Sequence, residues 1–290
     1  MKDKEKIYVP YHQIPETLKI RKGDCLLLTS DILKLAIAAK KNEHRFDTDA
    51  LLDSFIETLG PEGTLLIPAY NFDLESGDSY SVNKTLPMTG SLALAALRRN
   101  DFVRTANPLH SFLVHGQEAQ MLAELKNVSS FGPGSPFAWM MEKDALMLFA
   151  GTGLARAMTF THYVEESLQV SYRRYRNYLI SYTDKDGLTT LRKYKLFSKK
   201  PGFTMKLHLI EEKLKEKALQ TTYINGVPFS QIRCRDAYES ISRDIKENKA
   251  RSIAGFSITL YVRDIIKIPL QRFNIFRTTY GKIRSAKRIY

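Results

Sequence analysis

The sequence lacks features that several protein classes require. Its 290 residues include only two cysteines, Cys25 and Cys234, which are far apart and form no CxxC pair. Neither a disulfide framework nor a zinc site is therefore expected. No apolar run is long enough to cross a bilayer, and the N-terminal segment MKDKEKIYVP lacks the hydrophobic stretch of a signal peptide. We expect a cytoplasmic protein with reduced thiols and no metal ion.

The short motifs of several enzyme classes are also missing. The chain has no GxxxxGK loop and no Gly-x-Ser-x-Gly turn, which argues against a P-loop nucleotidase and a serine esterase. The turn Gly151-Thr152-Gly153 lacks the third glycine of a dinucleotide-binding loop, because Arg156 stands there. Without a zinc-finger spacing, an RNA-binding strand or a helix-turn-helix, we expect no nucleic-acid polymer as a partner.

What the chain does have is a large positive charge. It contains 44 lysines and arginines against 31 acids, a formal net charge of +13. Such a balance favours anionic partners, among them acidic lipid, coenzyme A and nucleotide sugars. The excess grows after Ser171, in the cluster Arg173-Arg174-Tyr175-Arg176, and the last twenty residues hold six basic residues and no acid.

Strand and helix patterns alternate in the first part of the chain. Buried-strand patterns cover residues 25–29, 64–69, 111–115 and 145–150, and helical patterns cover 47–59, 90–99, 117–125, 137–141 and 158–168. This alternation predicts an α/β fold with a mainly parallel central sheet flanked by helices. We assign residues 1–170 to this core.

The pattern changes beyond residue 170. Aromatic-rich strands over 178–182 and 189–195 flank the turn Asp184-Lys185-Asp186-Gly187 and predict a hairpin, and helices are expected over 205–216 and 235–246. No flexible linker precedes them, so residues 171–270 are expected to form a mixed α+β C-terminal cap and substrate region of the same domain. The basic tail, 271–290, suits an acidic membrane surface. More often such a tail packs on its own domain or on a second subunit, so a homo-oligomer stays an open alternative.

His162 is the leading candidate for a catalytic base. It follows the strand at 145–150, beyond the carboxyl end, where open α/β sheets form their ligand crevices. Glu165 and Glu166 lie three and four residues further on, so both carboxylates share the helix face of the imidazole. A carboxylate can hold an imidazole in one tautomer with a pKa near neutral, which a general base needs. A salt-bridged histidine on a surface helix would explain the same spacing.

Four short motifs in a fixed order carry a resemblance to a known family. They are Lys22-Gly23-Asp24 leading to Thr29-Ser30, the segment Arg104-Thr105-Ala106-Asn107-Pro108-Leu109-His110-Ser111, the turn Gly134-Ser135-Pro136, and Thr159 to Glu165. Over residues 18–170 the chain resembles the aminoglycoside 3-N-acetyltransferase-like family, which shares RSxxPxxS, GxxSP and TxxHxxE in this order. Thr105 replaces a serine and keeps the hydroxyl. The resemblance implies an α/β enzyme that transfers an acyl group from acyl-coenzyme A to an amine on a sugar ring.

The resemblance also implies roles for individual residues. His162 would be the base, and Glu165 would either orient it or hold the acceptor amine. The remaining positions, assigned to acyl-coenzyme A, are Thr29, Ser30, Pro108, His110, Ser111, Gly134, Ser135, Pro136 and Thr159. Structural explanations compete, because Ser135 with Pro136 reads equally as a helix cap followed by a first helical residue. His110 and Ser111 are adjacent in a strand and face opposite ways, which disfavours a hydrolase dyad.

The positive net charge of the chain also indicates which acceptor sugar it would favour. Aminoglycosides are polycations, and a basic chain favours instead an amino sugar linked to a nucleotide, as used in surface polysaccharide assembly. Tyr172, Arg173 and Arg174 would then contact the diphosphate or the base, unless they form a solvated cationic strand edge. Two alternatives stay open: aminoglycoside 3-N-acetylation, and a non-catalytic basic protein that binds polyanions.

Overall fold

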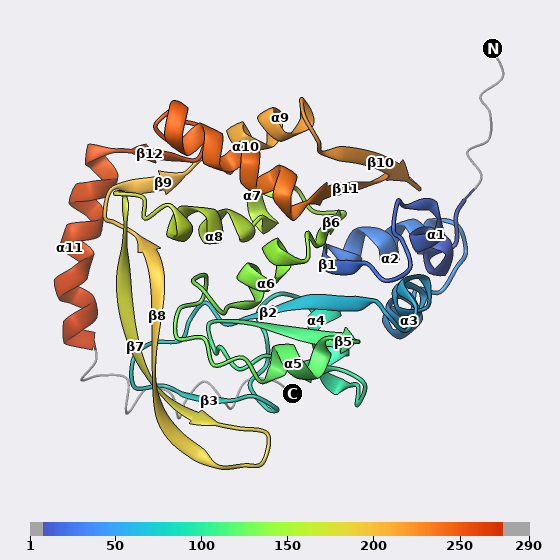
Figure 1. Ribbon diagram of the computed structural model, residues 1–290, viewed down its shortest axis with the longest axis horizontal. Coiled ribbons are helices and arrows are strands. Elements are labelled where there is room, and N and C mark those ends of the chain that lie inside the picture. The colour runs from blue at the N-terminus through green and yellow to red at the C-terminus, as the bar shows by residue number, and fades with distance from the viewer. Residues whose placement is uncertain (1–7, 275–290) are drawn as a thin grey trace.

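A seven-stranded mixed sheet forms the centre of the computed structural model, which describes residues 8–274 (Figure 1). Its order is β10 (Gln220–Ile224), β11 (Val227–Arg233), β6 (Leu146–Ala150), β1 (Cys25–Ser30), β2 (Thr64–Tyr70), β5 (His110–Gly116) and β4 (Val103–Arg104). Only β6, β1 and β2 run parallel, and the other strands are antiparallel to their neighbours. The α/β fold is confirmed, and the predicted mainly parallel sheet is corrected to a mixed sheet with a parallel centre.

Successive side chains along the strands alternate between two hydrophobic cores, one on each face of the central sheet. In β1, Leu26 and Leu28 pack on one side with α2 (Ile32–Lys41), α3 (Thr48–Leu59) and α4 (Ser91–Arg98). Leu27 points to the other side, which is covered by α5 (Ala119–Ala123), α6 (Pro136–Glu142), α7 (Leu154–Ala157), α8 (Phe160–Ser167), α9 (Leu207–Lys215) and α10 (Cys234–Glu247). Because both faces are covered, the central strands are apolar throughout rather than alternating.

Local sequence signals predicted most of the helices in the first part of the chain. The Asp47 carboxylate accepts hydrogen bonds from the backbone N–H groups of Asp49 and Ala50, at 2.8 and 3.3 Å, and so caps α3 as predicted. The same helix ends at Gly60, whose φ of 69° lies in the left-handed region. The predicted helix at 117–125 is shorter, and α2 was not predicted. The first residues of the described chain add a short turn, η1 (Tyr11–Gln13), and α1 (Ile14–Thr17).

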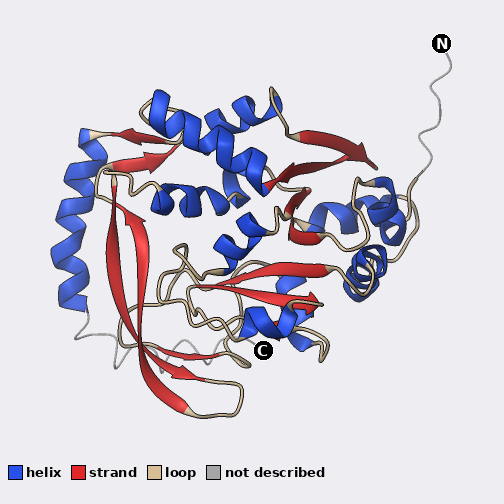
Figure 2. Cartoon of the chain, in the orientation of Figure 1, coloured by secondary structure: helices blue, strands red, loops and turns tan. Residues whose placement is uncertain are grey.

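The second part of the chain does not stand apart from the core. Its predicted hairpin is confirmed as β7 (Arg173–Thr183) and β8 (Thr189–Lys199), which form a smaller sheet with β3 (Ser79–Ser81) (Figure 2). A two-stranded sheet of β9 (Phe203–Met205) and β12 (Ala254–Phe256) leads to α11 (Ile258–Asn274). The β10–β11 hairpin, however, extends the central sheet alongside β6. Its turn is Asn225-Gly226, and both residues have a positive φ, 52° and 76°, as a tight hairpin turn requires.

No helix within residues 8–274 is long and apolar enough to cross a membrane. In the same part of the chain, no group of three or more His, Cys, Asp or Glu side chains could hold a metal ion. Cys25 and Cys234 are both free thiols. Residues 275–290, which make up most of the predicted basic tail, lie outside the described residues.

Candidate active site

The ends of four strands meet at one edge of the central sheet. β1, β2 and β6 all finish there, because parallel strands end at a common edge, and the antiparallel β5 begins there. The register pairs Ser30 with Ala150 and Tyr70 with His110. Segments that are far apart in the sequence, Thr29-Ser30 and His110, are thereby brought to the same edge, the usual place for a ligand crevice.

An aromatic chain connects this edge to His162. The ring of His110 lies 4.8 Å from that of Tyr70 and 4.6 Å from that of Phe131, measured between centroids. The other side of Phe131 meets His162 edge-on, with centroids 5.3 Å apart. The structure therefore gathers three of the four sequence motifs around Phe131, a residue that the motifs did not single out.

His162, whose side chain is 22% exposed, pairs with the buried Glu165 on α8. Nδ1 of His162 lies 2.7 Å from Oε2 of Glu165, one helical turn along, and the Glu165 side chain has no exposed surface. Arg173, the first residue of β7, joins the pair: its Nε lies 2.7 Å from the same Oε2, and its Nη2 lies 2.8 Å from Nδ1. A third arginine nitrogen, Nη1, donates to the carbonyl oxygen of Phe197 at 2.8 Å. The three side chains make one ion cluster in the protein interior.

The cluster sets the charge of each member. Burial, followed by the positive charge of Arg173, lowers the pKa of His162 despite the opposing effect of Glu165. Burial alone would raise the pKa of Glu165, but its hydrogen bond to His162 and the charges of His162 and Arg173 bring the pKa below its usual value. The cluster at neutral pH therefore consists of a neutral imidazole, a carboxylate and a guanidinium.

The cluster corrects the predicted role of Arg173. Its side chain is 5% exposed, and each of its three nitrogens lies within 2.8 Å of a protein atom, so it is not available to a diphosphate. Tyr172 is also buried, and burial followed by the negative charge of Glu165 raises the pKa of its hydroxyl. Of the three residues assigned to the acceptor in this segment, only Arg174 is exposed.

His110 and Ser111 have different surroundings. Burial, with the charges of His162 and Arg173, lowers the pKa of His110 to about 3, and its Nδ1 has no hydrogen-bond partner among the described residues. The Ser111 hydroxyl donates to the carbonyl oxygen of Ala69 at 2.6 Å and accepts from Arg104 at 2.9 Å. The Ser111 hydroxyl is therefore engaged in structural contacts, and its assignment to the coenzyme channel stays a prediction.

Arg104 is a buried cation that joins three segments. It is 6% exposed, and its guanidinium donates to Ala69 O at 2.8 Å, to Asn71 Oδ1 at 3.0 Å and to the carbonyl oxygen of Thr85. It also stacks over the Tyr80 ring, 5.2 Å from the centroid. The arginine of the second motif thus ties β4 to β2 and to the loop before α4.

The third motif begins a helix. The Ser135 hydroxyl accepts from the backbone N–H of Ala138 at 3.2 Å, and Pro136 is the first residue of α6. The competing structural explanation of these side chains therefore holds, because Ser135 is fully buried as a cap. Gly134, before them, is exposed and has a φ of 72°.

Thr159, the first residue of the fourth motif, precedes α8 without capping it, and its hydroxyl interacts with that of Tyr70.

Several buried polar atoms at the strand ends lack partners within residues 8–274. They include the hydroxyls of Thr29 and Ser30 and the side-chain nitrogen of Asn107. Pro108, between Asn107 and His110, is buried. Buried polar groups normally find hydrogen bonds, so atoms without partners at a crevice indicate groups that a ligand completes.

Glu166 has a different task from Glu165. It is 3% exposed, and its Oε1 accepts from the Ser129 hydroxyl at 2.6 Å and from the Tyr175 hydroxyl at 3.1 Å. A side chain at Gly132 would meet that same oxygen at 2.6 Å. Glu166 therefore fixes the loop that carries Phe131, and only Glu165 faces the imidazole.

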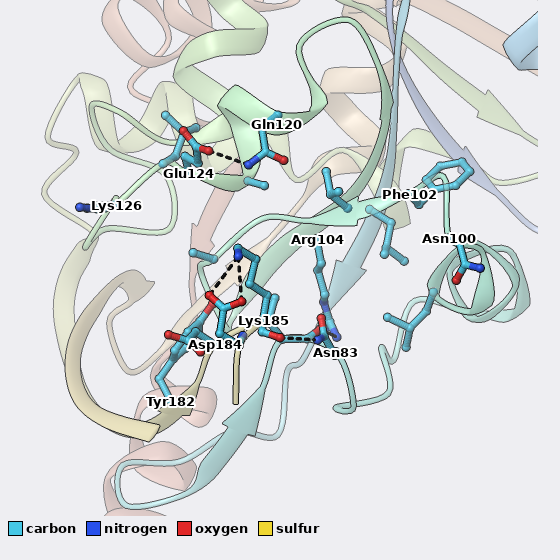
Figure 3. Close-up of a pocket in the computed structure, with 18 of the residues that line it drawn as sticks. Asn83, Asn100, Phe102, Arg104, Gln120, Glu124, Lys126, Tyr182, Asp184 and Lys185 are labelled. Atoms are coloured by element: carbon cyan, nitrogen blue, oxygen red, sulfur yellow. Dashed lines mark hydrogen bonds and ion pairs between the residues drawn. The ribbon is translucent and has the colours of Figure 1, made fainter. Parts of the chain in front are cut away.

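A large cavity of about 800 Å³ lies elsewhere, between α5, β4 and the tip of the β7–β8 hairpin (Figure 3). Gln120 and Glu124 line it from α5, and Asp184 and Lys185 line it from the hairpin turn (Figure 3). None of the residues assigned to the site from the sequence lines this cavity. The cluster around His162 and the cavity are therefore separate features.

Comparison with known proteins gives one family. The profile of the aminoglycoside 3-N-acetyltransferase family matches residues 40–245. No curated protein sequence matches the chain significantly.

Several solved structures share the fold. AAC-IIIb, as a binary complex with CoASH, superposes with a TM-score of 0.72 at 16% identity, covering 83% of this chain and 98% of its own. AAC-VIa with bound sisomicin gives 0.69 at 17% identity, with coverage of 83% and 99%. YokD of Bacillus subtilis gives 0.66 at 15% identity, with coverage of 84% and 96%.

Proposed function

The chain belongs to the aminoglycoside 3-N-acetyltransferase family, and from this premise we propose that it transfers an acetyl group from acetyl-coenzyme A to an amine of an aminoglycoside-type sugar. The observation that carries the proposal is the pair of partly exposed His162 and buried Glu165, 2.7 Å apart, near the edge where the central strands end. A neutral imidazole oriented by a carboxylate is the group that amine acylation needs at physiological pH.

In this mechanism Glu165 selects the tautomer of His162. A carboxylate only accepts hydrogen bonds, so the 2.7 Å contact places the imidazole proton on Nδ1 and leaves the lone pair on Nε2. In this tautomer one hydrogen of Arg173 Nη2 is donated to Met205 Sδ, 3.4 Å away, and the 2.8 Å contact of Nη2 with Nδ1 is not a hydrogen bond. We keep Glu165 as the residue that orients His162 rather than as a direct ligand of the amine.

The proton transfers follow from this arrangement. A sugar ammonium ion first loses one proton, which Nε2 of His162 takes and passes to solvent. The neutral amine attacks the thioester carbonyl, a C–N bond forms and the C–S bond breaks. The second proton of the nitrogen passes through His162 to the departing thiolate. Direct attack needs no acyl-enzyme, and buried Ser111 and Cys234 are not required as nucleophiles.

Acetyl-coenzyme A supplies the thioester, and residues at the strand ends suit its arm. The pantetheine arm carries two amides, which need hydroxyl or amide partners in a narrow apolar channel. Thr29, Ser30 and Asn107 provide buried polar atoms without partners, and Pro108 and Phe131 provide apolar surface. We propose these residues, with His110, as the channel. The complex of AAC-IIIb with CoASH supports a coenzyme A site in this fold.

The proposed acceptor, an aminoglycoside, differs from the nucleotide-linked amino sugar that the positive net charge of the chain favoured. Structures of the same fold hold sisomicin in AAC-VIa and gentamicin in a histidine-to-alanine variant of AAC(3)-IVa, the latter at a TM-score of 0.66 and 21% identity. The cations expected to bind a diphosphate are also partly lost, because Arg173 is buried against Glu165. We propose that residues 1–170 bind the coenzyme and that residues 171–270 border the acceptor, with exposed Arg174 near it.

A panel of acceptors tests the proposed function. The protein is incubated with acetyl-coenzyme A and, in separate reactions, with sisomicin, gentamicin, a nucleotide-linked amino sugar and a monosaccharide amine. Thiol release is measured. We expect the aminoglycosides to give the highest kcat/KM, because their amines match the family chemistry. Faster turnover of the nucleotide sugar would overturn the acceptor assignment, and no thiol release with any amine would overturn acetyl transfer itself.

The pH profile tests the state of His162. An imidazole acts as a base only when unprotonated, so kcat/KM should fall as the pH drops through the pKa of His162, which lies below its ordinary 6.5. Arg173→Met removes a positive charge that lowers this pKa. We expect the acidic limb of the variant to lie at higher pH than that of the wild type. Arg174→Met, one residue along and exposed, is the matched control and should keep the wild-type limb. Identical limbs in all three proteins would contradict this electrostatic role of Arg173.

A further inference from the structure

The helix α11 carries an apolar face that no described part of the chain covers. Ile258, Val262, Ile265 and Ile266 are 67%, 50%, 43% and 59% exposed. Spacings of four, seven and eight residues put them on one side of a helix. We call these four residues the α11 face. Figure 1 shows α11 at the outer edge of the molecule, beside β9, β12 and the β7–β8 hairpin.

The direction of the α11 face is fixed by contacts on the opposite side. Asp264 accepts a hydrogen bond from the backbone N–H of Gly202 at 3.1 Å, and Leu260 is half-buried. Tyr261 packs against Phe256, with ring centroids 5.9 Å apart. The helix is thus held by its polar and aromatic side and turns its aliphatic side outward.

The sequence around this face is strongly cationic. From Ile258 to the end of the chain there are eight lysines and arginines and one acid, Asp264. That acid is engaged, because it pairs with Arg263 at 3.2 Å as well as with Gly202. An aliphatic helix face within a cationic segment is the composition of helices that lie in the interface of an anionic bilayer.

We propose that the α11 face binds the surface of a lipid bilayer that carries anionic headgroups. The aliphatic side chains enter the interface, and described basic residues beside this helix, among them Arg263 and Lys199, whose charges both act on Asp264, supply the electrostatic attraction. A second copy of the chain fits the face less well, because it would bring two segments of the same strong positive charge together. The proposal does not depend on the acetyl-transfer function.

Cosedimentation with vesicles tests this surface. The full-length protein is mixed with vesicles of phosphatidylcholine alone, or of phosphatidylcholine with phosphatidylglycerol. We expect binding only to the anionic vesicles, and weaker binding at high salt, since screening removes the electrostatic part. The double variant Val262→Asp with Ile266→Asp should bind about tenfold less tightly or worse.

A matched control distinguishes binding through the α11 face from nonspecific binding by any exposed aliphatic side chains. Leu33 and Ile37 form a second exposed aliphatic pair with the same four-residue spacing, on α2, at 64% and 47% exposure. Leu33→Asp with Ile37→Asp should leave vesicle binding unchanged. Unfolding temperatures show whether each variant is folded. The proposal is overturned if the wild type ignores anionic vesicles, if both double variants bind like the wild type, or if the α11 variant instead turns a dimer into a monomer.

Discussion

Replacing His162 by alanine is expected to slow acetyl transfer about 100- to 10,000-fold, the usual contribution of a positioned general base. No other imidazole near the site can substitute. His110 is the neighbour across Phe131, and its pKa of about 3 makes it a very weak base. Coenzyme A binding should change little, because the strand-end hydroxyls of Thr29 and Ser30 remain.

Two measurements separate loss of the base from loss of the fold. Thiol release at saturating acceptor gives the chemical rate, and calorimetric titration with coenzyme A gives the binding constant. His162→Gln keeps an amide near Glu165 and should be as slow as the alanine variant, because glutamine cannot take a proton. His208→Ala removes an exposed histidine on α9 and is the control. Near-normal turnover of either His162 variant would contradict the mechanism.

Replacing Arg104 by methionine is expected to lower the free energy of unfolding by about 3 to 5 kcal/mol. Methionine fills much of the space but donates no hydrogen bond. The carbonyl oxygen of Thr85 and the side-chain oxygen of Asn71 would lose this donor in the interior, and the carbonyl oxygen of Ala69 would keep only the hydrogen bond from Ser111. Each such buried acceptor costs about 1 to 3 kcal/mol when left unpaired.

Urea unfolding measures this loss. The midpoint should fall while the slope of the transition stays constant, because the surface exposed on unfolding hardly changes. Arg98→Met makes the same chemical change at an exposed position of α4 and should stay within about 0.5 kcal/mol of the wild type. A stable Arg104→Met protein would show that the loop before α4 does not need this cation.

The sequence predicted best what depends on neighbours along the chain. The contact between His162 and Glu165 follows from helical spacing, and the cap at Asp47 follows from its position before an amphipathic run. The strands that end at the site were also predicted, because buried strands leave continuous apolar runs. What such runs do not encode is direction, so a mainly parallel sheet was expected, whereas β5 runs antiparallel to β2.

Contacts between distant segments could not be predicted. Arg173 reads as part of an exposed basic cluster, and only the path of the chain from α8 into β7 turns it onto Glu165. Ser111 reads as a crevice residue, yet its partners lie on β4 and β2. In both cases the deciding partner is a buried charge or carbonyl whose position depends on the tertiary fold.

The ion pair between Arg173 and Glu165 also limits how the molecule can move. It fastens β7 to α8, while β10 and β11 are hydrogen-bonded into the same sheet as β1 and β6. A hinge motion that separated residues 171–270 from the first part would break a buried ion pair, at a cost of about 3 to 5 kcal/mol. The opened state is thus rarely populated, and we expect substrates to exchange mainly through local movement of loops at the sheet edge.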